Sequence, residues 1–117
     1  MISNKHTFVL IFLLTTSLIC FGQLGSIDSL KLELRKSKND SLKCEIYIDL
    51  GNLYSKIDLD SALFYVEKAQ SVAENFINKK LWAQCIMGDV KRELGNIHYY
   101  KKDFDNTIAY YESAAQV

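Results

Sequence analysis

The sequence predicts an all-α fold of stacked antiparallel helical hairpins. Apolar residues recur every three or four positions through most of the chain after residue 26, which is the spacing of one face of an α-helix. Proline is absent and only five glycines occur in 117 residues, so few residues would interrupt helices. A Leu-Gly-Asn segment, a turn and spaced small residues occur twice, at 50–69 and 94–114. A supersecondary unit used twice indicates a helical repeat.

The composition argues against nucleic-acid binding, and the length limits the number of domains. The 14 basic and 14 acidic residues cancel, whereas a nucleic-acid surface shows a basic excess on one face. A chain of this length has room for one small domain.

Residues 1–22 are predicted to be a cleaved signal peptide. Lys5 precedes an apolar run over residues 8–21, which suits a signal core but is shorter than the roughly 20 residues of a membrane span. Cys20 and Gly22 supply small residues for cleavage before Gln23. Lipidation of Cys20 and an uncleaved anchor are the alternatives. Cleavage would place the protein in the periplasm or cell envelope.

Residues 23–41 are expected to form a leading helix that caps the repeats. Ile27, Leu30 and Leu34 lie at helical spacing, with charged residues on the other face. This helix should end near Asn39, and Asp40-Ser41 supplies the N-cap of the next one.

Two hairpins, about 42–76 and 79–117, should follow. The first helix of the first hairpin is expected over residues 42–57, and Asp60 or Ser61 would cap its second helix. The second hairpin should consist of helices over 78–100 and from Thr107 to Val117, joined by a turn at 103–106.

Gly51 and Gly95 each fall inside a predicted helix. Glycine costs up to about 1 kcal/mol relative to alanine there, so each is expected to allow a neighbouring helix to approach its backbone. The residues expected to pack the repeats are Leu50, Gly51, Tyr54, Ala62, Ala69, Leu94, Gly95, Phe104, Tyr111 and Ala114.

These residues resemble the tetratricopeptide repeat (TPR), a helix-turn-helix unit of about 34 residues that stacks into an α-solenoid. Leu94, Gly95 and Asn96 match its first helix, and Tyr111 and Ala114 match its second. The chain departs from the pattern at Lys102, where the family often has glycine, and at Thr107, which replaces alanine. It also departs in its repeat length, because the two glycines are 44 positions apart. Its order of segments also resembles the N-terminal exported repeat region of bacterial envelope sensor proteins.

The resemblance implies a peptide-binding groove. By the family pattern Asn52, Arg92 and Asn96 point into the concave side, as in the TPR proteins that grip a peptide carboxylate, because a guanidinium pairs well with a carboxylate. Ile48 takes the place of the arginine in the first copy, so half of such a clamp is missing. The alternative is that these are ordinary solvated side chains.

No catalytic constellation is present, and we expect no cofactor and no metal site. His98 is expected to be a packed side chain, and Cys44 and Cys85 are expected to be small buried residues rather than a disulfide. The chain should therefore be a non-enzymatic, exported module that binds a protein or peptide, as the N-terminal part of a longer repeat protein. The alternatives are the extracytoplasmic sensory region of a signalling protein, such as a histidine kinase, and a homodimer formed through an uncovered last helix.

Overall fold

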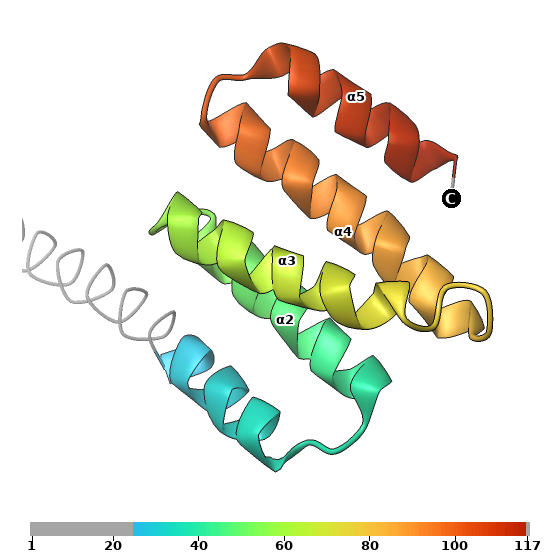
Figure 1. The fold of residues 1–117 in the computed structure, drawn as a ribbon. Helices are drawn as coiled ribbons and strands as arrows, with labels where there is room; N and C mark the ends of the chain where they lie inside the picture. The colour runs from blue at the N-terminus through green and yellow to red at the C-terminus, as the bar shows by residue number, and fades with distance from the viewer. Residues whose placement is uncertain (1–24, 117) are drawn as a thin grey trace, which may run out of the picture.

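The computed structural model describes residues 25–116, and these residues are helical apart from short connections (Figure 1). A leading helix spans 25–36. The four helices that follow are α2 (Asp40–Tyr54), α3 (Leu59–Glu74), α4 (Leu81–Tyr100) and α5 (Phe104–Ala115). The predicted signal peptide lies outside the described residues. No helix within the described part is both long and apolar enough to cross a membrane.

The helices form two antiparallel hairpins that stack side by side. Helix α2 packs on α3 and α4 packs on α5, while α3 also packs on α4 and α2 touches α4 (Figure 1). This arrangement confirms the predicted all-α fold of stacked helical hairpins.

Asn and Asp side chains set three helix starts, and each helix begins earlier than the sequence suggested. Asn39 caps α2, since its side chain accepts hydrogen bonds from Ser41 N and Leu42 N. Asp58 caps α3 by accepting from Asp60 N. The predicted caps at Asp40 or Ser41 and at Asp60 or Ser61 are therefore wrong, because the capping side chain lies before the first helical residue and reaches forward to free backbone N–H groups.

The helix starts of the second hairpin also differ from the prediction, one beginning earlier and one later. Asp103 accepts from Asn106 N and starts α5 at Phe104 rather than Thr107. Helix α4 starts at Leu81 rather than residue 78, after Lys80, which provides no side-chain cap. Between α4 and α5, Lys102 has φ of 62°, the left-handed conformation that glycine adopts most easily.

Two clusters of buried side chains hold the array together. The larger lies among α2, α3 and α4 and includes Val66, Val90 and Ile97, all 0% exposed. In the smaller, Ile27 of the leading helix packs with Ile46 and Leu50 of α2. The leading helix therefore covers the outer side of the first hairpin.

Gly51 and Gly95 mark the closest helix contacts. A Cβ atom at Gly51 would lie 2.6 Å from Val66 Cγ2, and one at Gly95 would lie 2.7 Å from Tyr111 Cδ1. Ordinary carbon–carbon contacts are about 3.5–4.0 Å, so a side chain at either site requires the neighbouring residue to shift. In both cases the close neighbour is the second helix of the same hairpin, α3 for Gly51 and α5 for Gly95.

The other residues expected to pack the repeats differ in burial. Leu50, Ala62, Ala69 and Leu94 are buried, and Tyr54 and Ala114 are half-buried. Tyr111 is 39% exposed and Phe104 is 55% exposed. Phe104 contacts the ring of Tyr99, with centroids 6.0 Å apart, on a side of α5 that no described helix covers.

The two cysteines described in the structure are both free thiols. Cys44 is buried, and burial, followed by the charges of Asp40 and Glu45, raises its pKa to about 11. Cys85 is exposed, contrary to the expectation that it is buried, because it lies on a different face of α4 from the buried Ala83 and Ile86.

Candidate functional site

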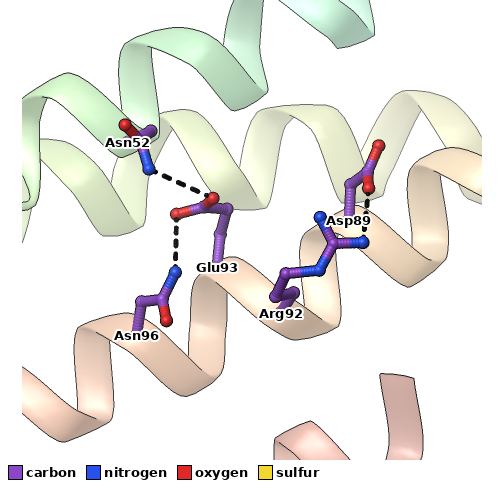
Figure 2. A network of polar contacts seen from close by, with 5 residues as sticks. All are labelled: Asn52, Asp89, Arg92, Glu93 and Asn96. Carbon is purple, nitrogen blue, oxygen red and sulfur yellow. Dashed lines mark hydrogen bonds and ion pairs between the residues drawn. The ribbon is translucent and has the colours of Figure 1, made fainter. Parts of the chain in front are cut away.

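A buried glutamate joins the two hairpins. Glu93 of α4 is only 7% exposed. Its Oε1 accepts a hydrogen bond from Asn52 Nδ2 of α2, and its Oε2 accepts one from Asn96 Nδ2, one turn further along α4, both at 3.4 Å. Figure 2 shows the three side chains pointing toward one another across the space between α2 and α4.

Tyr111 extends this arrangement to α5. Its hydroxyl donates a hydrogen bond to Asn96 Oδ1. Burial raises the pKa of Tyr111, and the charge of Glu93 raises it further, so the hydroxyl keeps its proton and remains a donor. Asn52, Glu93, Asn96 and Tyr111 therefore form one polar network that spans three helices.

Arg92 lies beside the network but is not part of it. Its guanidinium forms an ion pair with Asp89 at 2.9 Å, and its side chain is 59% exposed. Figure 2 shows it turned toward Asp89 and away from Glu93. Arg92, Asn96 and Tyr111 line a hollow of about 530 Å³ between α4 and α5.

The surface around the network is acidic. The pKa of Asp49 on α2 is raised, first by partial burial and then by the negative charges of Glu45, Asp89 and Glu33. Within residues 25–116, neither the Arg92–Asp89 ion pair nor the contact of His98 with Asp103 includes Glu93. The carboxylate of Glu93 is thus held by neutral amide donors, and no cationic side chain among the described residues forms an ion pair with it. Such a surface favours hydrogen-bond donors and cations.

The sequence matches the family model described as SusR N-terminal TPR domain over residues 23–105. This match covers well over half of the chain. The chain belongs to the SusR N-terminal TPR domain family. The predicted tetratricopeptide resemblance is thereby confirmed, and the chain resembles SusR-like bacterial envelope proteins.

No curated protein matches the chain. No solved structure matches it either.

The SusR-type TPR match includes most of the polar network but not all of it. Asn52, Glu93 and Asn96 lie inside the matched residues, as does the neighbouring Arg92, whereas Tyr111 follows them. The structure brings Asn52 and Asn96 together through Glu93, while Arg92 is directed elsewhere. Sequence reasoning missed Glu93 and the Tyr111 hydroxyl. The spacing of Glu93 and Asn96 was the available signal, since residues three apart share one helix face.

His98 and the acidic side chains show no arrangement typical of a metal site. His98 stacks on Tyr110 with ring centroids 5.2 Å apart, and its Nδ1 lies 3.3 Å from Asp103 Oδ2. Among the described residues, no group of three or more His, Cys, Asp or Glu side chains is placed to hold a metal ion.

Proposed function

We propose that this chain is a non-catalytic protein-interaction scaffold that binds a basic peptide segment at the surface carrying Asn52, Glu93 and Asn96. TPR domains generally mediate protein–protein interactions. The observation that carries the proposal is the buried, unpaired charge of Glu93 at the junction of two hairpins. The fold holds this charge in place before any partner arrives.

The chemistry favours a cationic partner over an acidic one. A lysine or arginine of the partner would approach Glu93 and the neighbouring Asp49, and charge-assisted hydrogen bonds are about twice as strong as neutral ones. The two asparagine side chains have amide groups that suit the backbone of an extended peptide. Arg92, which a carboxylate clamp requires, is already paired with Asp89, and a peptide carboxylate would meet the acidic side chains around it.

We further propose that the chain is exported by its signal peptide, residues 1–22, and forms the N-terminal part of a longer repeat protein in the cell envelope. The support is the apolar run after Lys5 and the match to a family described as an N-terminal domain. The alternative is that the chain is the extracytoplasmic sensory region of a signalling protein such as a histidine kinase.

Fluorescence anisotropy with a labelled lysine-rich octapeptide tests the binding proposal. The full chain should bind this peptide at least about tenfold more tightly than a glutamate-rich octapeptide of the same length, a difference of about 1.4 kcal/mol. Glu93→Gln should remove most of this preference while keeping the fold. Glu74→Gln, an exposed change at the end of α3, is the matched control and should have little effect. Equal binding of the two peptides would contradict the proposal.

Arg92→Ala distinguishes a surface that binds cations from one that binds a peptide carboxylate. If the surface selects cations, removing Arg92 frees Asp89 and strengthens binding of the lysine peptide. If the residues act as a carboxylate clamp, the same substitution weakens binding of a peptide with a free C-terminal carboxylate and leaves the lysine peptide unaffected.

A further inference from the structure

The helix ends of the array gather at two opposite edges, because consecutive helices run antiparallel (Figure 1). One edge carries the turns inside the two hairpins, from α2 to α3 and from α4 to α5. The other edge carries the connection from the leading helix to α2 and the connection from α3 to α4. Residues 35–43 and 74–82 therefore lie at the same edge, although they are far apart in the sequence.

The two edges differ in charge. Residues 35–43 and 74–82 contain six basic and two acidic residues. The segments of the same length at the other edge, 53–61 and 98–106, contain three basic and four acidic residues. The zero net charge of the whole chain thus hides a cationic edge. We call it the basic edge, and its cations are Arg35, Lys36, Lys38, Lys43, Lys79 and Lys80.

The fold does not use these six cations for its own stability. Five of them are exposed and Lys43 is partly exposed. Within residues 25–116, no carboxylate forms an ion pair with any of them. Their charges are therefore open to a partner from outside the chain.

The backbone that carries the cations is ordered. Asn39 caps α2 directly after the first connection. In the second connection, the N–H groups of Lys79 and Lys80 both donate to the carbonyl oxygen of Phe76 at 2.9 Å. The ring of Phe76 lies 5.2 Å from that of Trp82, and both pack against the larger buried cluster. The basic edge is thus presented by a fixed surface.

An exposed leucine lies beside the cations in each connection. Leu81 directly follows Lys80 and is 76% exposed, more than any other large hydrophobic side chain among the described residues. Leu42 directly precedes Lys43 and is 45% exposed. Removal of such side chains from water is favourable. Lysine beside leucine is the combination by which interfacial segments bind lipid, since the cation meets the headgroup and the apolar side chain enters the acyl boundary.

We propose that the basic edge docks on an anionic lipid surface, with its cations against the headgroup phosphates and with Leu42 and Leu81 inserted below them. Each basic residue held near such a surface adds to the attraction. Nucleic acid would also attract the cations, but its phosphate backbone offers no apolar partner for the leucines. An acidic protein segment has the same deficiency.

This surface is separate from the one that carries Glu93. Glu93 lies twelve residues beyond Leu81 along α4, a distance of about 18 Å in an α-helix. The docking of lipid therefore does not depend on the binding of a basic peptide.

Trp82 provides the readout, because it is the one tryptophan of the chain and lies at the basic edge. Vesicles of phosphatidylglycerol, or of neutral phosphatidylcholine, carry a nitroxide quencher near the headgroup. The quencher acts at short range, so entry of the apolar run near the N-terminus into a vesicle does not by itself quench Trp82. In the full chain, phosphatidylglycerol should quench Trp82 at least about threefold more than phosphatidylcholine. Equal quenching by the two lipids would overturn the proposal.

Matched variants test the position of the surface. Lys79→Gln together with Lys80→Gln should remove at least about half of the preference for phosphatidylglycerol. Lys101→Gln together with Lys102→Gln removes the same charge from the opposite edge and should leave most of the preference. Leu81→Asn should weaken the quenching while the circular dichroism spectrum stays that of the parent. If the two lysine pairs have equal effects, the attraction follows net charge and the basic edge is not the docking surface.

Competition tests the class of partner. A short DNA duplex or the glutamate-rich octapeptide is added at the same concentration of negative charge as the lipid. Neither should reduce the quenching of Trp82 by phosphatidylglycerol vesicles more than about twofold. If either abolishes it, the basic edge binds nucleic acid or an acidic protein segment, and the lipid proposal is wrong.

Discussion

Replacing each helical glycine by alanine should affect the two hairpins differently. Alanine is favoured over glycine inside a helix by about 0.5–1 kcal/mol, so any loss of stability must come from the added methyl group. At Gly51 that methyl lies 2.6 Å from Val66 Cγ2 and 3.4 Å from the Ala62 carbonyl oxygen. Val66 is 0% exposed and branched at Cβ, so it has little freedom to turn away.

Overpacking of this kind costs about 1–3 kcal/mol, so Gly51→Ala should destabilise the fold by a net of about 1 kcal/mol. At Gly95 the three atoms nearest to the methyl all belong to the ring of Tyr111, which is 39% exposed and can swing outward. Gly95→Ala should therefore change stability by less than about 0.5 kcal/mol after the helix-propensity gain, at the expense of the Tyr111–Asn96 hydrogen bond.

Urea unfolding followed by circular dichroism gives both values. The midpoint should fall for Gly51→Ala with an unchanged slope, which marks a true loss of stability, and it should stay near that of the parent for Gly95→Ala. If Gly95→Ala is the less stable variant, or if the two are equal, then the packing of α3 and α5 on their glycines does not control stability as described.

Two further substitutions test the turn before α5. Lys102→Gly should stabilise the chain by about 0.5 kcal/mol. Glycine relieves the strain of the left-handed backbone at φ of 62°, and this gain is partly offset because glycine raises the conformational entropy of the unfolded chain. A lower urea midpoint would contradict this prediction. Asp103→Ala should lower the thermal midpoint at pH 7. Hydrogen bonds from Asn106, its side chain first, lower the pKa of Asp103, so the ionised cap stabilises the fold above about pH 4 and this contribution is lost as the pH falls through the lowered value. The difference in thermal midpoint between Asp103→Ala and the parent should therefore shrink in acid. A difference that stays constant from pH 7 to pH 3 would contradict this role of the Asp103 cap.

The repeat could be predicted from sequence because its signals are local. The apolar stripes, Gly51 and Gly95 all lie within single hairpins, and helical spacing alone identifies them. The observed helix starts differ from the predicted ones by a few residues. Several Asn, Asp and Ser residues lie near each turn, and only the geometry decides which side chain reaches a free N–H group.

The candidate site was harder to predict because it depends on contacts between hairpins. Glu93 accepts a hydrogen bond from Asn52, 41 residues earlier. Its spacing from Asn96 places both side chains on one face of α4, but that local pattern does not predict that Glu93 is buried. The pairing of Arg92 with Asp89 follows from their spacing on one helix, but the family resemblance assigned Arg92 to a peptide-carboxylate clamp instead.

Nitrogen–proton correlation spectra of the full, ¹⁵N-labelled chain test the binding surface most directly. Addition of the lysine-rich octapeptide should shift the side-chain amide signals of Asn52 and Asn96, whose NH₂ groups donate to Glu93. The signals of Asn75 and Asn106, which donate to Ser71 and Asp103, serve as internal controls and should stay in place. A glutamate-rich octapeptide should shift neither pair. If the lysine peptide moves only the control signals, or moves none, then the surface around Glu93 is not where this protein binds a basic partner.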